Sequence, residues 1–173
     1  MRKVLITGGA GFLGKRLAQA IDWADEIVLA DLIEAEDPPD GVQTVVGDVS
    51  HQEDIERIVD GDVTDVFHFG AVVSSGAEAD FNLGMNVNLE GTIHLLEAVR
   101  ALPGKPTFTF ASSCAIFGSR GGSLPCDAAA RPESSYGAQK ACGELLVNDF
   151  ARKGFIQGVS LSLIHISEPT RPY

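Results

Sequence analysis

The stretch KVLITGGAGFLG, residues 3–14, decides the fold. An apolar run ends in glycines spaced G-x-x-G-x-x-G, and residues 15–21 continue in a helical pattern. This order predicts a β-strand, a tight turn and a helix whose N-terminal amides and positive dipole can hold a pyrophosphate. Gly8 permits the turn, Gly11 lets the backbone approach the phosphates, and Gly14 lets the helix pack closely on the strand.

Composition limits the class of protein and its partners. The chain has 173 residues, a length sufficient for one domain with a substantial core. Of these residues, 45% are hydrophobic and 21% are charged, as in a soluble globular protein. A net charge of −11 argues against a nucleic acid or an anionic membrane surface as partner. No apolar run approaches the length of a membrane span, and no signal peptide is evident. We therefore expect a cytoplasmic enzyme or binding protein.

The cysteines and histidines form no recognisable metal site. Cys114, Cys126 and Cys142 show neither a metal-ligand spacing nor a C-x-x-C pair, so we expect reduced thiols. His68 lies within an apolar strand pattern, and we expect it to pack in the core or to bond backbone. The sequence thus predicts no bound metal.

Strand and helix patterns alternate along the chain. After the first strand and helix, apolar runs predict five more strands, at residues 26–31, 43–48, 65–69, 107–112 and 158–163. Helical spacing predicts helices at 51–59, 81–101 and 134–153, with Ser50 and Ser134 as N-caps of the first and last. Such alternation predicts a parallel sheet covered by helices on both faces, a doubly wound α/β (Rossmann) fold.

The last residues do not fit this pattern. Residues 161–171, LSLIHISEPTR, look like the translation of a sequencing adaptor. We therefore expect one domain over residues 1–160 and a non-native read-through tail over 161–173, which makes the fold C-terminally truncated. An ordinary C-terminal strand and loop is the alternative.

Asp31 ends the second predicted strand about twenty residues after the glycine loop. A carboxylate at this place can accept hydrogen bonds from both hydroxyls of an adenosine ribose and would repel a 2′-phosphate. Leu32 and Ile33 follow it, so no arginine is adjacent to bind such a phosphate. The sequence therefore favours NAD over NADP.

A second group of residues follows the fifth strand. Ser112 and Ser113 end that strand, and Tyr136 and Lys140 lie four apart on the next helix, on one face. The Lys140 ammonium and the charge of an oxidised nicotinamide should lower the tyrosine pKa from its usual value near 10. Tyr136 could then take a hydroxyl proton while a serine hydroxyl polarises the substrate oxygen.

Together these motifs resemble the extended short-chain dehydrogenase/reductase family, also called the NAD-dependent epimerase/dehydratase family. The resemblance covers residues 3–160. Six motifs carry it: TGGAGFLG at 7–14, GDV at 47–49, FHFGA at 67–71, NLEGT at 88–92, SSCAIFG at 112–118 and YGAQK at 136–140.

The resemblance implies a role for each site residue. It makes Ser113 the catalytic serine, Tyr136 the acid/base and Lys140 its modulator. The residues that it implies contact NAD are Gly8, Gly11, Phe12, Leu13, Gly14, Asp31, Asp48, Val49, Gly70, Ala71, Val72, Ser74, Asn88, Tyr136 and Lys140. Phe12 and Leu13 would act through backbone amides, Asp48 and Val49 would meet adenine, and Asn88 would steady the site. Ser74 would lie at the mouth between cofactor and substrate.

Departures from the family pattern narrow the activity. Gln139 stands where serine or threonine commonly precedes the lysine, and Cys114-Ala115 lacks the Asp-Glu pair of sugar-nucleotide dehydratases. Residues 72–81, 135–140 and 154–158 resemble a subgroup that oxidises D-erythronate at C2 with NAD. The implied small-molecule partner is a sugar acid or a nucleotide sugar. The resemblance also implies that the full-length enzyme is a homodimer.

Two other functions remain open. A UDP-sugar 4-epimerase would use the same Ser113, Tyr136 and Lys140 but return the hydride to its substrate. A non-catalytic NAD(H)-sensing module would have no need of the tyrosine–lysine pair. Because the substrate region of this family follows the sixth strand, we expect this chain by itself to show little or no turnover.

Overall fold

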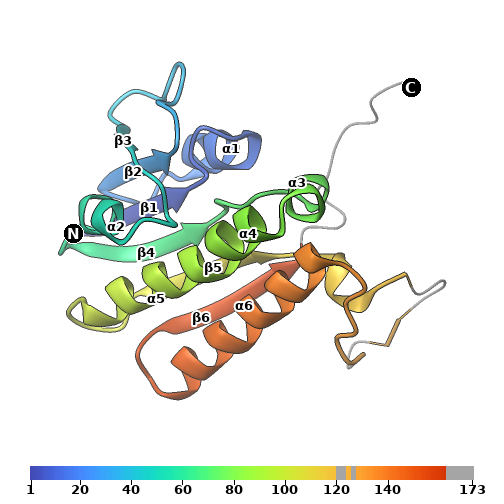
Figure 1. Cartoon of the computed structure of the whole chain (residues 1–173). Coiled ribbons are helices and arrows are strands. Elements are labelled where there is room, and N and C mark those ends of the chain that lie inside the picture. The colour runs from blue at the N-terminus through green and yellow to red at the C-terminus, as the bar shows by residue number, and fades with distance from the viewer. Residues whose placement is uncertain (120–123, 126–127, 163–173) are drawn as a thin grey trace.

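Six parallel strands form one sheet in the order β3-β2-β1-β4-β5-β6 in the computed structural model, which describes residues 1–119, 124–125 and 128–162 (Figure 1). The strands are β1 (Lys3–Thr7), β2 (Glu26–Asp31), β3 (Gln43–Val46), β4 (Val63–His68), β5 (Thr107–Ser112) and β6 (Gln157–Ser162). The predicted strands and fold class are confirmed. Since every strand is parallel, all six carboxyl ends lie at the same edge, where ligands bind in such sheets.

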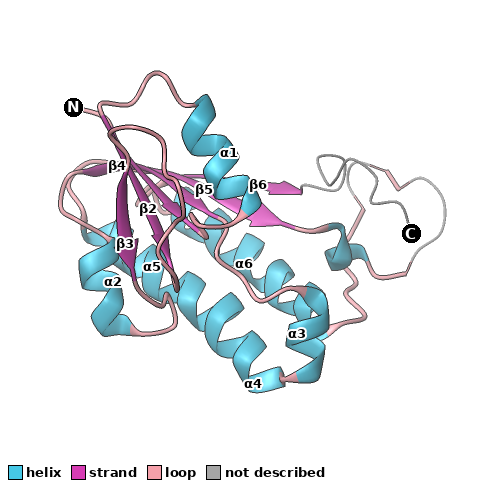
Figure 2. Cartoon of the chain, turned by 90° about the horizontal axis from the view of Figure 1, so that it is seen from above, coloured by secondary structure: helices cyan, strands magenta, loops and turns pink. Residues whose placement is uncertain are grey.

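Helices cover the two faces of the sheet unequally (Figure 2). On one face α1 (Phe12–Ala20) packs through Ala18 against a cluster that includes Val4, Ile6 and Leu29. On the other face α2 (Gln52–Ile58), α5 (Gly91–Ala101) and α6 (Ser135–Arg152) enclose a larger apolar core. The β1 residues alternate between these two cores and are all buried, which explains the unbroken apolar run in the sequence.

Toward β6 the face that α1 covers becomes open. Val159 and Leu161 pair with Thr109 and Ala111 and are 42% and 47% exposed. Phe108 and Phe110, which point to the opposite face, are fully buried. Within the described residues, the helical cover on the α1 side therefore extends over β1 and β2 but does not reach β6.

The long helix predicted at 81–101 has the predicted extent but is not uniform. It begins as α4 (Phe81–Gly84), widens into a π-helical segment (Met85–Glu90) and continues as α5. Its inward face is not wholly apolar, and the apolar side chain of Ile93 is 36% exposed. Apart from glycines, the buried residues are Asn88, Thr92, Leu95, Leu96 and Val99. Polar Asn88 and Thr92 face inward because they hydrogen-bond there.

Two local predictions fare differently. Ser50 is not the N-cap of α2: His51 occupies that position, and the Ser50 hydroxyl instead donates to Asp48 Oδ1 at 2.7 Å. Ser134 is the N-cap of α6, as predicted, and its hydroxyl accepts from the amide of Gly137 at 3.0 Å. The sequence reading also missed the short helix α3 (Ser74–Ala79) between β4 and α4.

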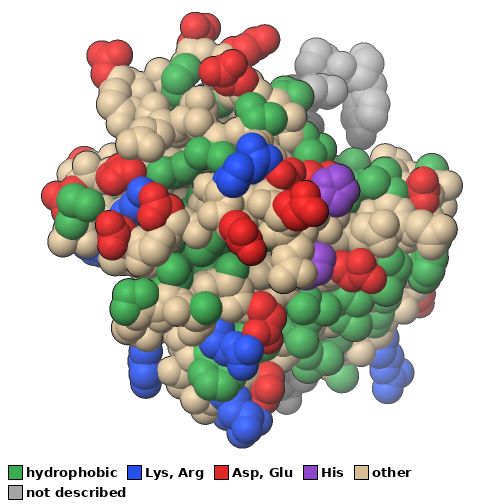
Figure 3. Space-filling model, turned by 60° about the vertical axis from the view of Figure 1, so that its left-hand side comes forward, with side chains coloured by type: hydrophobic (Ala, Val, Ile, Leu, Met, Phe, Trp, Pro, Cys, Tyr) green, Lys and Arg blue, Asp and Glu red, His purple; other side chains and the backbone are tan. Residues whose placement is uncertain are grey.

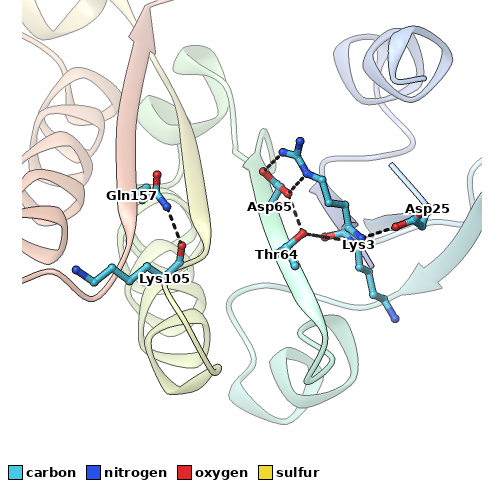
Figure 4. Close-up of polar contacts among 7 residues, drawn as sticks. Lys3, Asp25, Thr64, Asp65, Lys105 and Gln157 are labelled. Carbon is cyan, nitrogen blue, oxygen red and sulfur yellow. Dashed lines mark hydrogen bonds and ion pairs between the residues drawn. The ribbon is translucent and has the colours of Figure 1, made fainter. Parts of the chain in front are cut away.

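Polar contacts fasten the amino ends of the strands, opposite the ligand-binding edge (Figure 4). Thr64 Oγ1 accepts from the Lys3 amide at 3.1 Å and donates to the Asp65 carboxylate at 2.8 Å. Arg2 pairs with the same carboxylate at 2.9 Å. At the other side of the sheet, Gln157 Nε2 donates to Lys105 O at 3.3 Å. These contacts fix where β1, β4 and β6 begin.

The predicted boundary at residue 160 stays a prediction. Leu161 and Ser162, which the sequence reading assigned to the tail, are the last two residues of β6 and pair with Ala111 and Ser112. The rest of the predicted tail, residues 163–173, lies outside the described residues. Among the helices described, none combines the length and apolar character that crossing a membrane would require.

Candidate active site

The loop between β1 and α1 lies at the carboxyl edge and accepts only glycine at two positions. Gly8 has φ +69°, and a Cβ there would lie 2.7 Å from the amide nitrogen of Gly70. A Cβ at Gly14 would lie 2.5 Å from the carbonyl oxygen of Gly8. Gly11 is the residue at the N-cap of α1, so no side chain covers the first amides of the helix. This loop fits a pyrophosphate at the helix N-terminus.

A cavity of about 370 Å³ opens beside this loop. Eight of the predicted cofactor residues line it: Gly8, Gly11, Asp31, Asp48, Val49, Gly70, Ala71 and Val72. Leu83 and Val87 add an apolar wall that the sequence reading missed. They come from the helix 81–101, whose approach to this edge is visible only once the chain is folded. The cavity combines the phosphate-binding loop with an apolar slot of the kind that a nucleotide base requires.

The two acidic residues of this cavity are ordered by backbone amides. Asp31 Oδ2 accepts from the amide of Ala10 at 3.0 Å, so the carboxylate also holds the glycine loop. Its other oxygen accepts from the amide of Leu32 at 2.7 Å. Asp48 Oδ1 accepts from the amide and hydroxyl of Ser50. Each carboxylate keeps acceptor capacity for ligand hydroxyl or amino groups.

A second cavity of about 340 Å³ brings the predicted catalytic residues together. Ser113, Tyr136 and Lys140 line it with Leu13 from the start of α1. Phe69 and Ala71 line both this cavity and the first one, which we call the nucleotide cavity. The two spaces therefore share a wall at the carboxyl end of β4, so one dinucleotide could extend from Asp31 to Tyr136.

Lys140 is almost completely enclosed. It is 2% exposed, its Nζ donates to Ala111 O at 2.9 Å, and it lies 4.7 Å from the ring centroid of Phe110. Burial lowers the pKa of Lys140 from 10.5 to about 8. The ammonium lies 5.8 Å from the centroid of the Tyr136 ring, over its face. It is thus placed beside the tyrosine as predicted.

The predicted lowering of the tyrosine pKa does not occur in the protein without cofactor. Burial raises the pKa of Tyr136 above its ordinary value of 10, and the nearby Cys114 thiol adds to this. The hydrogen bond with the Ser113 side chain acts in the opposite direction but is weaker. Lys140 hydrogen-bonds Ala111 O, and its charge does not offset the burial. The other charge named in the prediction, that of an oxidised nicotinamide, would act in the lowering direction.

Four predicted cofactor residues, Phe12, Gly14, Ser74 and Asn88, line neither cavity, and two of them, Phe12 and Ser74, have exposed side chains. The Phe12 side chain is 61% exposed and lies against Arg16, which leaves only its backbone amide for the predicted role. Ser74 is exposed as the first residue of α3, and the neighbouring Val73 lines the second cavity instead. The structure therefore does not bring the Ser74 side chain into the mouth where the sequence reading expected it.

His68 links β1 to α5 through buried hydrogen bonds. Its Nδ1 lies 2.6 Å from Thr7 Oγ1, and its Nε2 lies 3.0 Å from Thr92 Oγ1. Because the Thr92 hydroxyl donates to Asn88 O, Nε2 carries the proton and Nδ1 accepts from Thr7. Burial, with a smaller effect of the Lys140 charge, lowers the pKa of His68 to about 3. The neutral ring packs in the core, as predicted, although its partners are threonine hydroxyls.

Asn88 fixes the loop after β4 at two points. Its Oδ1 accepts from the amide of Val72 at 2.8 Å, and its Nδ2 donates to Val72 O at 3.0 Å. The same Nδ2 donates to Gln139 Oε1 at 2.8 Å. The predicted steadying role fits this geometry. The contact of Gln139 with Asn88 was not predicted, because the only sequence signal of Gln139 is its unusual place before Lys140.

The cysteines and charged side chains of the described residues show no metal-binding arrangement. Cys114 and Cys142 are free and exposed, and Cys126 lies outside the described residues. The described residues include no group of three His, Cys, Asp or Glu side chains arranged to hold a metal. Acidic side chains spread over the face in Figure 3, with basic ones scattered between them rather than gathered in a patch.

Comparisons with known proteins agree with this site. The sequence profile of the NAD dependent epimerase/dehydratase family matches residues 4–172. D-erythronate dehydrogenase of Cupriavidus necator is 43% identical over 98% of the chain and 57% of its own length. Uronate dehydrogenase of Pseudomonas syringae pv. tomato is 30% identical over 93% of the chain and 58% of its own length.

A solved structure supports the same assignment. The Thermus thermophilus UDP-glucose 4-epimerase complex with NAD matches with a TM-score of 0.76 and 30% identity, over 94% of this chain and 54% of that one. The chain thus spans little more than half the length of each of these proteins. The family match reaches residue 172 and so lends no support to an adaptor-derived tail. This chain belongs to the NAD-dependent epimerase/dehydratase family.

Proposed function

We propose that the protein oxidises a secondary hydroxyl of a D-erythronate-like sugar acid, with transfer of the hydride to NAD. The observation that carries this proposal is the joint cavity of Ser113, Tyr136 and Lys140, which shares a wall with the nucleotide cavity. A hydride acceptor must reach the substrate carbon and an acid/base group must reach the hydroxyl oxygen on that carbon, and the shared wall allows this.

The cofactor would be held by residues of the first cavity. The amides at the start of α1 would bind the pyrophosphate, and Asp31 would accept from the adenosine-ribose hydroxyls. Asp48 and Val49 would meet the adenine. When bound, NAD supplies the hydride acceptor and a positive charge near the phenol of Tyr136. Asp31 disfavours a 2′-phosphate, which supports NAD rather than NADP.

Residues of the second cavity would take the proton from the substrate hydroxyl. The Ser113 hydroxyl would polarise the substrate oxygen, and the Tyr136 phenolate would take the hydroxyl proton. Lys140 would stabilise the phenolate and orient the nicotinamide ribose, since its ammonium is fixed by Ala111 O. Ser113 Oγ accepts from the amide of Ala115 at 3.2 Å, which leaves the hydroxyl proton for the substrate oxygen.

The substrate class rests on the relatives and on one local feature. Two of the similar proteins named above are dehydrogenases, of D-erythronate and of uronate, and both names denote sugar acids. Cys114 and Ala115 replace the acidic pair expected of a dehydratase. The likeness to a UDP-glucose 4-epimerase keeps epimerisation as the second candidate.

Net NADH formation separates the two candidates. We would join residues 1–160 to the C-terminal part of the Cupriavidus necator relative and supply NAD with either D-erythronate or UDP-galactose. We expect the absorbance of reduced nicotinamide to rise with D-erythronate only, and the 173-residue chain alone to give no turnover. Conversion of UDP-galactose to UDP-glucose, with no NADH from any four-carbon sugar acid, would contradict the proposal.

A further inference from the structure

We propose that Gln139 is a positioning residue that holds the loop after β4, through Asn88, in the form that accepts NAD. This inference rests on the nucleotide site described above but not on the identity of the sugar substrate. Gln139 lies on α6 beside Lys140, is 1% exposed and touches neither of the two ligand cavities itself. It can therefore act on the cofactor only through a neighbour.

That neighbour is Asn88. Its Nδ2 has two protons, of which one is donated to Val72 O and the other to Gln139 Oε1. With both donors and Oδ1 engaged, the Asn88 carboxamide is held in one orientation. Val72 in turn lines the nucleotide cavity with Gly70 and Ala71. The contact with Gln139 thus limits the freedom of a backbone segment that faces the ligand.

Gly84 makes room for this glutamine. A Cβ at Gly84 would lie 2.7 Å from Gln139 Nε2 and 2.9 Å from the Cβ of Ala77, so glycine is needed there. Among the described residues, Gln139 Nε2 has no hydrogen-bond partner. A buried amide that leaves one end unpaired is poorly suited to add stability. Its Oε1, in contrast, accepts the hydrogen bond from Asn88 Nδ2.

The loop after β4 is also held at Gly70, so the Asn88 contact restrains only its Val72 end. Gly70 N donates to Thr7 Oγ1 at 3.2 Å, and this hydroxyl belongs to the His68 hydrogen bonds described above. At Val72 both backbone groups are held by Asn88. Loss of the Gln139 contact should therefore loosen the Val72 end of the loop while the Gly70 end stays fixed.

Binding of NAD tests the proposal, with substitutions that separate position from stability. Gln139→Met keeps the side-chain length and removes the acceptor, and we expect it to raise the Kd for NADH about tenfold. Gln139→Glu keeps an oxygen at the same place and should stay within about threefold of the unsubstituted chain. Val147→Ala, on the buried side of the same helix, should lower Tm without changing the Kd.

Hydrogen exchange at Val72 supplies a readout that needs neither cofactor nor substrate. The Val72 amide should exchange slowly in the NAD-free chain and about tenfold faster in Gln139→Met, while the amide of Leu29 in β2 stays slow. An unprotected Val72 amide in the unsubstituted chain would overturn the proposal, even if no variant folds. Equal Kd values for Gln139→Met and the unsubstituted chain, or equal losses in Val147→Ala and Gln139→Met, would also overturn it. A folded chain with a protected Val72 amide that binds no NADH would instead refute the nucleotide site.

Discussion

Replacing Tyr136 with phenylalanine is expected to lower kcat of the fusion enzyme about 10³-fold and to change the Kd for NADH by no more than about threefold. The substitution removes the only group in the second cavity that we assign to proton transfer. It leaves the ring, and with it the contact between the ring face and the Lys140 ammonium. Cofactor binding should survive because the nucleotide cavity does not include Tyr136.

Steady-state kinetics with D-erythronate and a fluorescence titration with NADH would measure the two quantities separately. Cys142→Ser is a suitable control, because that exposed thiol lies on the same helix and outside both ligand cavities. More than a tenth of the original kcat in Tyr136→Phe would contradict the acid/base role. Loss of NADH binding together with kcat would show that the residue is structural.

Replacing Lys140 with methionine is expected to abolish turnover and to make the chain more stable at pH 7. Burial lowers the pKa of Lys140 from 10.5 to about 8, so keeping the ammonium charged in the fold costs about 3 kcal/mol. Methionine avoids this cost but gives up the hydrogen bond to Ala111 O, worth about 1 kcal/mol. We expect the free energy of unfolding to rise by about 2 kcal/mol.

The pH dependence identifies the cause. Between pH 8 and 10.5 the unfolded chain holds the Lys140 proton more tightly than the folded one, so the stability of the unsubstituted chain gains relative to Lys140→Met. The advantage of the variant should therefore be largest below pH 8 and shrink as pH rises toward 10.5. Urea denaturation at several pH values would measure it. A variant less stable at pH 7, or an advantage that grows with pH, would contradict this explanation.

Much of the fold could be predicted because the deciding signals are local. A glycine loop, a strand that ends in Asp31 and a serine-ended fifth strand each occupy a few consecutive residues, and regular alternation of strands and helices fixes the topology. The N-cap of α2 could not be predicted as easily. Ser50 and His51 are adjacent, and the contact of Ser50 with Asp48 decided which of them begins the helix.

The parts that escaped prediction depend on contacts between distant residues. Thr92 on α5 looks like a surface residue until His68 is seen to pair with it. The role of Gln139 also appears only when its hydrogen bond with Asn88 is seen. The raised pKa of Tyr136 was likewise hidden, since helical spacing places Lys140 nearby but does not show how deeply the phenol is buried. Sequence spacing indicates which side chains can meet; the extent of their burial appears only in the fold.

A titration of the 173-residue chain with NADH and with NADPH, followed by the fluorescence of the reduced nicotinamide, tests the nucleotide site most directly. We predict saturable binding of NADH, and binding of NADPH at least about tenfold weaker, because the Asp31 carboxylate, which lines the nucleotide cavity, would repel a 2′-phosphate. A folded chain that shows no saturable binding of NADH, or that binds NADPH more tightly, would contradict the assignment of Gly8, Gly11 and Asp31 to NAD.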